Sequence, residues 1–286
     1  MKENFKIRSS SGVDLGVSFF KSDESKALIQ IVHGMQEHKE RYDDFANYLC
    51  SNGYDVVIHD HLGHGQSINE EHPLGDLVSL ENLISDIHLV RKEINFNGEY
   101  ICFGHSMGSF LARIYSSIYP VDKLVACGTG QPSKIAAGFL KFLLKFQKHK
   151  KPLPNIQKLV IGPYEKNFED PNTWISNNEE NRKAYMEDEL CGNPFTREGF
   201  ETLADIVIRL NDENTFKNCT AKEILLIAGS GDPVGDFAKG IKKVEDKYQS
   251  YGKSVQKIIY QDMAHEILNE KENKKVYKDV LDFVNK

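Results

Sequence analysis

Short apolar segments alternate with segments of helical periodicity along much of this chain. Residues 27–32 (Ala-Leu-Ile-Gln-Ile-Val) are almost continuously apolar, which is typical of a strand that is buried on both faces of a sheet. Residues 80–95 instead repeat apolar side chains every three or four positions, which predicts a helix. Similar strand-like segments occupy residues 4–8, 13–20, 54–58, 100–103, 124–127, 224–228 and 254–260. The alternation predicts an α/β fold with a mostly parallel, eight-stranded sheet flanked by helices.

The alternation is interrupted between residues 131 and 200. This region contains helix-like segments and no strong strand, and Pro152 and Pro154 are expected to end its first helix. We therefore expect a core formed by residues 1–130 and 201–286, with residues 131–200 inserted as a helical cap, or lid, over one edge of the sheet.

Composition excludes several classes of protein. The chain has 286 residues and a formal net charge of −6, which argues against a nucleic-acid partner. Its five cysteines are an odd number and show neither a disulfide framework nor zinc-ligand spacing. The N-terminal residues lack the apolar segment of a secretory signal, and no run of 18 apolar residues occurs. We expect a reduced, cytoplasmic protein, and the sequence leaves its oligomeric state open.

Polar segments, most of which contain glycine, follow several of the predicted strands. Because ligands of open parallel sheets bind at the carboxyl ends of the strands, these segments are expected to share one edge and form the functional site. They are residues 33–38, 60–67, 104–108, 229–235 and 261–266.

Residues 104–108 (Gly-His-Ser-Met-Gly) form the pattern G-x-S-x-G between a predicted strand and a predicted helix. In that context the pattern marks a nucleophilic serine on a strained turn, although the same residues also suit an ordinary glycine-rich turn. Asp232 and His265 follow later strands, and alone each also has a simple structural explanation as a helix cap or a surface residue. Together and in this order, they predict a triad: Ser106 as nucleophile, His265 as general base and acid, and Asp232 orienting the histidine.

Two backbone N–H groups are candidates for an oxyanion hole. One belongs to Met107, directly after the nucleophile, and the second belongs to Met35, in the loop after the strand at 27–32. Metal and nucleotide sites are disfavoured. Residues 59–64 are rich in histidine but lack the acid that a metallo-β-lactamase pattern needs before His64, and residues 229–231 lack the lysine of a P-loop. We expect no cofactor and no metal.

Several of these motifs resemble those of the α/β-hydrolase superfamily, and within it the monoacylglycerol lipase and lysophospholipase (serine aminopeptidase-like) branch. The residues that carry the resemblance are His33-Gly34-Met35, Glu37-His38, Arg41-Tyr42, Asp60 with Gly63-His64-Gly65-Gln66-Ser67, Gly104–Gly108, Gly231-Asp232-Pro233-Val234 and His265-Glu266. The resemblance implies an esterase or lipase that works through an acyl-enzyme, with a helical cap between the sixth and seventh strands. The family often has arginine where His61 or Leu62 stands here, a position outside the catalytic set.

The resemblance implies a small-molecule ester or lipid as substrate, with monoacylglycerol or lysophospholipid types favoured. Phe139, Phe142 and Phe146 form an apolar stripe in the cap, flanked by lysines. The stripe predicts a helix packed on the core, or one that lines an acyl-chain site and makes transient contact with a membrane surface.

Two other functions remain open from the sequence. A proline-iminopeptidase-like amide hydrolase would need carboxylates in the cap to hold a substrate amine. The candidates, which also suit a solvated acidic helix, are Glu179, Glu180, Glu187, Asp188 and Glu189. A binder on the same fold without catalysis is the second alternative, although such proteins usually have a broken triad.

Overall fold

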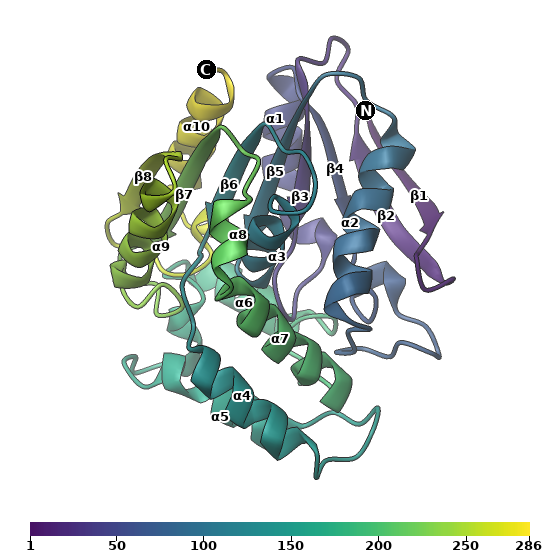
Figure 1. Cartoon of the computed structure of the whole chain (residues 1–286), viewed down its shortest axis with the longest axis vertical. Coiled ribbons are helices and arrows are strands. Elements are labelled where there is room, and N and C mark those ends of the chain that lie inside the picture. Colours follow the sequence, from purple (N-terminus) through teal and green to yellow (C-terminus); the bar gives the residue numbers. More distant parts are fainter.

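The computed structural model describes residues 1–286, except for the side chain of Pro171. Its centre is an eight-stranded sheet with the strand order β1-β2-β4-β3-β5-β6-β7-β8 (Figure 1). The antiparallel pairs are β1 with β2 and β2 with β4, and the remaining neighbours are parallel. The strands are β1 (Lys2–Arg8), β2 (Asp14–Phe20), β3 (Ala27–Val32), β4 (Asp55–His59), β5 (Glu99–His105), β6 (Lys123–Cys127), β7 (Glu223–Gly229) and β8 (Ser254–Tyr260). The predicted α/β fold class is confirmed.

Helices cover both faces of the sheet, which explains why the central strands are apolar on both sides. One face is covered by α1 (Asp43–Ser51) and α10 (Asn273–Val284). The other is covered by α2 (Leu80–Ile94), α3 (Met107–Tyr115) and α9 (Lys239–Ser250). All residues of β3, β4 and β6 are buried between these layers, as expected for the middle of a parallel sheet.

The chain between β6 and β7 is mainly helical. Figure 1 shows α4 and α5 beyond the end of the sheet, on the side opposite the two chain termini. The last long helix of the segment, α7, packs against α3 and α4, and its Phe200, Ile206 and Leu210 belong to the main core. The helices are α4 (Lys134–Leu144), α5 (Pro154–Glu165), α6 (Glu179–Glu187), α7 (Arg197–Leu210) and α8 (Glu213–Lys217).

The end of the first helix in this segment differs from our expectation. Helix α4 ends at Leu144, well before Pro152 and Pro154. Pro154 instead begins α5, because proline lacks only an N–H group that has no partner in the first turn of a helix. Short 3₁₀ helices occupy Lys39–Tyr42, Gly65–Ser67, Pro171–Trp174 and Ile267–Asn269. Within the described part of the chain, no helix combines the length and hydropathy needed to cross a membrane.

Candidate active site

Ser106 lies on a tight turn between β5 and α3. Its backbone has φ 53° and ψ −124°, a strained combination for a residue with a side chain. Close backbone packing explains the glycines on either side. A Cβ atom on Gly104 would lie 2.2 Å from the carbonyl oxygen of Gly108, and one on Gly108 would lie 2.0 Å from that of Val32. The local sequence therefore fixes the position of the serine at the edge of the sheet.

The structure brings Ser106, His265 and Asp232 together from the ends of three strands. His265 Nε2 lies 2.8 Å from Ser106 Oγ, and His265 Nδ1 lies 2.9 Å from Asp232 Oδ1. Asp232 is fully buried, and its Oδ1 also accepts a hydrogen bond of 2.9 Å from the backbone N–H of Val234. The carboxylate is thus held from two sides and faces the imidazole. This is the geometry in which histidine can take a proton from a serine hydroxyl.

Electrostatics favour a basic His265. Burial alone lowers the pKa of the imidazole, but the Asp232 carboxylate beside it, with smaller contributions from Glu266 and Glu37, raises the net pKa above the ordinary value of 6.5. The His105 ring lies 4.8 Å from the His265 ring and is tilted by 41° to it, and burial lowers the pKa of His105 to about 3. His105 is therefore neutral near pH 7 and does not repel the proton on His265.

Met35 and Met107 both line the cavity next to Ser106. Met107 begins α3, whose N-terminus carries a partial positive charge that favours a developing anion. The loop that carries Met35 is held by Glu37, whose carboxylate accepts hydrogen bonds from the Gly34 N–H at 2.5 Å and the Tyr42 hydroxyl at 2.8 Å.

The histidine-rich segment at residues 59–64 braces the same loop. The buried Asp60 carboxylate accepts hydrogen bonds from the N–H groups of Lys39 and Gln66, at 2.8 and 2.9 Å. The His61 N–H donates to His33 Nε2 at 3.0 Å, which ties this segment to the loop after β3. Burial lowers the pKa of His59 and of His64 to about 4, so both rings are neutral near pH 7.

A pair of buried acids lies beside Ser106 and His265, and the sequence motifs that contain these acids do not by themselves indicate their role. Glu37 and Glu266 both line the cavity, and Arg41 forms an ion pair with Glu266. Burial, with the nearby Glu266 charge, raises the pKa of Glu37 to about 7. Burial also acts to raise the pKa of Glu266, but the Arg41 charge and the hydrogen bonds from Asn181 and Asn269 together lower that pKa overall. Two features of the sequence could have indicated this acid pair. They are the spacing of Glu37 and Arg41, and the position of Glu266 next to His265.

A cavity of about 540 Å³ opens above Ser106 and His265. Its wall is largely apolar and includes Phe110, Phe139, Leu140, Leu159, Val160 and Trp174. Of the predicted phenylalanines, only Phe139 lines it within the described structure. Phe142 and Phe146 point outward, with 54% and 73% of their surfaces exposed, and Phe146 lies beyond the end of α4.

The acidic residues considered for an aminopeptidase lie elsewhere. As far as the described side chains define the wall of the cavity, it includes none of Glu179, Glu180, Glu187, Asp188 and Glu189. Its carboxylates come instead from Glu37, Asp236 and Glu266. The cavity therefore combines an apolar wall with acids placed next to His265.

Comparison with known proteins agrees with this geometry. The model of the family described as serine aminopeptidase, S33, matches residues 23–272. Monoglyceride lipase of Rattus norvegicus is 35% identical over 100 residues, which are 35% of this chain and 33% of that protein. Thus the match covers about a third of the relative's length. Monoacylglycerol lipase of Mycolicibacterium smegmatis is 24% identical over 263 residues, 91% of this chain and 89% of that protein.

Among solved structures, a thermostable carboxyl esterase from Bacillus coagulans, in complex with glycerol, has a TM-score of 0.91 at 24% identity. The superposition covers 99% of this chain and 98% of that one. This similarity extends over both the sheet and the helical segment between β6 and β7. It supports the assignment of the fold.

Proposed function

Because the chain belongs to the serine aminopeptidase S33 family and is similar to proteins named monoglyceride lipase and monoacylglycerol lipase, we propose that it is a serine hydrolase of carboxylic esters. Monoacylglycerols or lysophospholipids are the favoured substrate class. The observation that carries the proposal is the hydrogen-bonded series Ser106–His265–Asp232 at the base of a largely apolar cavity. A cavity of about 540 Å³ is within the size range of sites that enclose small organic ligands.

The mechanism follows from the position of each group. Ser106 Oγ attacks the ester carbonyl while His265 Nε2 takes its proton, and Asp232 stabilises the imidazolium that results. The N–H groups of Met35 and Met107 bind the developing oxyanion; removal of one such donor typically costs about 10²–10³ in rate. His265 then protonates the leaving alcohol. A water molecule, deprotonated by the same histidine, releases the acid from the acyl-enzyme.

Amide hydrolysis is the second candidate, because Glu37 and Glu266 lie in the cavity beside His265. The surroundings of these two acids favour ester hydrolysis over amide hydrolysis. Burial and the nearby Glu266 charge raise the pKa of Glu37, and two hydrogen bonds already occupy its Oε1. The charge of Glu266 is already paired with Arg41. Neither of these two is a free carboxylate for a substrate amine, and the third carboxylate of the wall, Asp236, is exposed to solvent. The third possibility is a binder without catalysis. It would give the hydrogen-bonded series Ser106–His265–Asp232 no chemical role.

We place the helical segment at residues 131–200 over the site as a cap. The exposed side of α4 presents Ile135, Phe139 and Phe142 to solvent, with Phe146 just beyond the helix. Lysines 134, 141 and 145 flank this stripe. Apolar side chains bordered by lysines favour shallow contact with an anionic membrane surface, where a lipid substrate would enter.

A panel of substrates tests this function. Initial rates would be measured on nitrophenyl esters of increasing acyl length, a monoacylglycerol, a lysophospholipid and a prolyl amide. We expect the esters to be cleaved and the monoacylglycerol or lysophospholipid to be preferred over short esters. Faster cleavage of the prolyl amide than of every ester would overturn the ester assignment in favour of the peptidase. The absence of turnover on all of them would favour a binder.

A further inference from the structure

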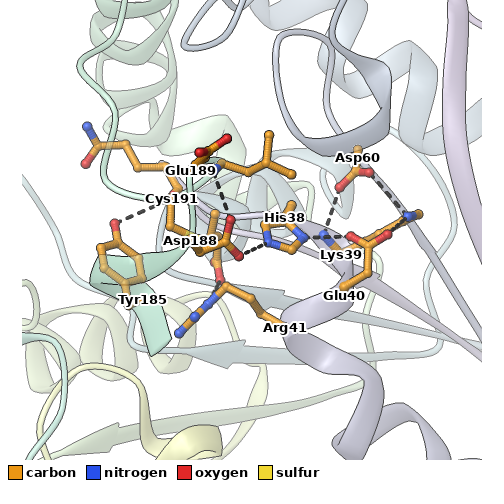
Figure 2. A network of polar contacts seen from close by, with 12 residues as sticks. His38, Lys39, Glu40, Arg41, Asp60, Tyr185, Asp188, Glu189 and Cys191 are labelled. Carbon is orange, nitrogen blue, oxygen red and sulfur yellow. Dashed lines mark hydrogen bonds and ion pairs between the residues drawn. The ribbon is translucent and has the colours of Figure 1, made fainter. Parts of the chain in front are cut away.

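His38, Asp188 and Cys191 meet where the loop after β3 contacts the segment between α6 and α7 (Figure 2). One nitrogen, one oxygen and one sulfur atom from these three residues lie within 4.8 Å of one another. His38 Nε2 is 2.7 Å from Asp188 Oδ2. These three atom types are all ligands of zinc in proteins. The sequence hid the cluster, since His38 and Asp188 are 150 positions apart.

A tight turn places Asp188 and Cys191 on the same side. The Cys191 N–H donates to the Asp188 carbonyl oxygen at 3.0 Å, and the Leu190 N–H donates to Asp188 Oδ1 at 2.8 Å. The second bond orients the carboxylate and leaves Oδ2 directed at His38. The resulting D-x-x-C arrangement presents two ligand atoms from one turn, as the paired cysteines of zinc ribbons do.

The other nitrogen of His38 already has the partner that a metal-bound histidine needs. His38 Nδ1 lies 2.6 Å from Glu40 Oε2, and the second oxygen of Glu40 is contacted by Lys39 and by Gln66. Figure 2 shows this line of contacts from Asp188 through His38 to Glu40. A carboxylate on the far nitrogen fixes the ring and leaves Nε2 as the ligand atom, which is the usual arrangement around zinc.

Burial and charge also suit a divalent cation. His38 and Cys191 are each 7% exposed, whereas the Asp188 side chain is 29% exposed and provides access from solvent. Burial lowers the pKa of His38, but its bonds to Cys191, Glu40 and Asp188 outweigh burial and raise that pKa to about 11, so Zn²⁺ must displace a tightly held proton. The neutral imidazole that results, together with a thiolate and a carboxylate, carries two negative charges, which balance Zn²⁺. The nearby Arg41 does not disturb this balance, because its charge is paired with Glu266.

We propose that His38 Nε2, Asp188 Oδ2 and Cys191 Sγ form a Zn²⁺ site, with water as the fourth ligand. Binding releases the thiol proton of Cys191 and the proton between His38 and Asp188 to solvent. Tetrahedral ligands at about 2.0–2.3 Å from zinc lie roughly 3.3–3.7 Å from one another, so the His38–Asp188 pair, now 2.7 Å apart, must open by at least about 0.6 Å. Asp188 is on a partly exposed turn and can move by that amount.

The metal would connect two segments that already touch. The carbonyl oxygen of Gln36 accepts hydrogen bonds from the Gly192 N–H at 3.0 Å and from the Tyr185 hydroxyl at 3.2 Å. Zinc would add a stronger link between the same segments, beside Met35. The site does not use Ser106, so the proposal stands or falls independently of the hydrolase function.

The test is metal binding by the full-length protein after dialysis against a chelator. With Co²⁺ as a spectroscopic probe, the wild type should show a thiolate-to-cobalt charge-transfer band at one equivalent, and Zn²⁺ should displace it. Zn²⁺ at 100 times its Kd would favour the folded state by about 100-fold, which raises the melting temperature. Cys191→Ser should abolish the band and the thermal shift.

Two further variants make the result specific. Cys50→Ser removes a partly exposed thiol in α1, outside the cluster, and should retain the band and the thermal shift. Asp188→Asn changes a partly exposed side chain, keeps the thiol and should weaken Zn²⁺ binding by at least 10-fold; it also serves if Cys191→Ser does not fold. The proposal is overturned if the wild type shows no thiolate band, or if the band survives in Cys191→Ser. The cluster would then be a hydrogen-bonded contact between the two segments and nothing more.

Discussion

Replacing Asp232 with asparagine tests how the acid acts on His265. The Asp232 carboxylate is buried and 2.9 Å from His265 Nδ1, so the two charges of the imidazolium–carboxylate pair are centred about 4 Å apart. At an effective dielectric constant of about 20, that pair is worth about 4 kcal/mol. Each 1.36 kcal/mol of barrier is tenfold in rate, so Asp232→Asn should lower kcat by about 10³-fold.

The hydrogen bonds around Asp232 limit the loss to this charge effect. Oδ1 accepts hydrogen bonds from both Val234 N–H and His265 Nδ1, whereas Oδ2 has no partner among the described residues. The asparagine oxygen should therefore remain at Oδ1 and preserve the histidine tautomer, which avoids the loss of about 10⁴-fold that a wrong tautomer causes. The amide NH₂ then replaces Oδ2. As a buried donor without a partner, it should lower the free energy of unfolding by about 1–3 kcal/mol.

The assay is kcat and kcat/KM against pH for wild type and Asp232→Asn on one nitrophenyl ester. Asp262→Asn is the matched control, because Asp262 is exposed in the loop before His265 and the same chemical change there should leave the rate unaltered. The acid limb of the variant should move to lower pH, since the group that raises the pKa of His265 is gone. A loss below 10-fold, or an unchanged acid limb, would refute the reasoning.

Three further predictions follow from the same structure. Gly108→Ala should lower the free energy of unfolding by about 1–3 kcal/mol, because its Cβ would lie 2.0 Å from the Val32 carbonyl oxygen. Gly138 has open space around it, so Gly138→Ala should be neutral or stabilising in the same thermal melts. In wild type, kcat/KM should fall as pH drops through the raised pKa of His265, with a midpoint above 6.5, because only the neutral imidazole takes the serine proton; a midpoint below that value would contradict the effect of Asp232. Phe139→Ser should reduce the preference for long acyl chains in the ester series, while Phe142→Ser, outside the cavity, should retain it; equal effects would contradict the assigned wall.

The sequence was sufficient for the sheet and for the edge where the site lies. Apolar segments such as residues 27–32 predict strands that are buried on both faces, and only a parallel sheet covered by helices provides that environment. Parallel strands direct their following loops to one edge. The loops that carry Ser106, Asp232 and His265 could therefore be placed together before any distance was known.

Contacts between segments that are far apart in the chain could not be predicted from the sequence. Arg41 and Glu266 are 225 positions apart, and neither residue by itself indicates the ion pair that controls the acids in the cavity. The side of α4 that faces the cavity was equally hidden, because periodicity identifies an apolar stripe but not what covers it. Phe139 lines the cavity although 59% of its surface is exposed, whereas Phe142 and Phe146, in the same stripe, do not line it.

The role of Ser106 as nucleophile is the central claim, and covalent labelling tests it most directly. Wild type and Ser106→Ala would be treated with a fluorophosphonate probe, and the modified residue located by mass spectrometry. Ser109→Ala, in the first turn of α3, is the control for another nearby serine. We predict one adduct on Ser106 in wild type and in Ser109→Ala, and no adduct in Ser106→Ala. Ser106→Ala should also lower kcat by about 10⁴–10⁶-fold while its melting curve stays unchanged. Labelling that persists in Ser106→Ala, or turnover near the wild-type rate, would contradict the account.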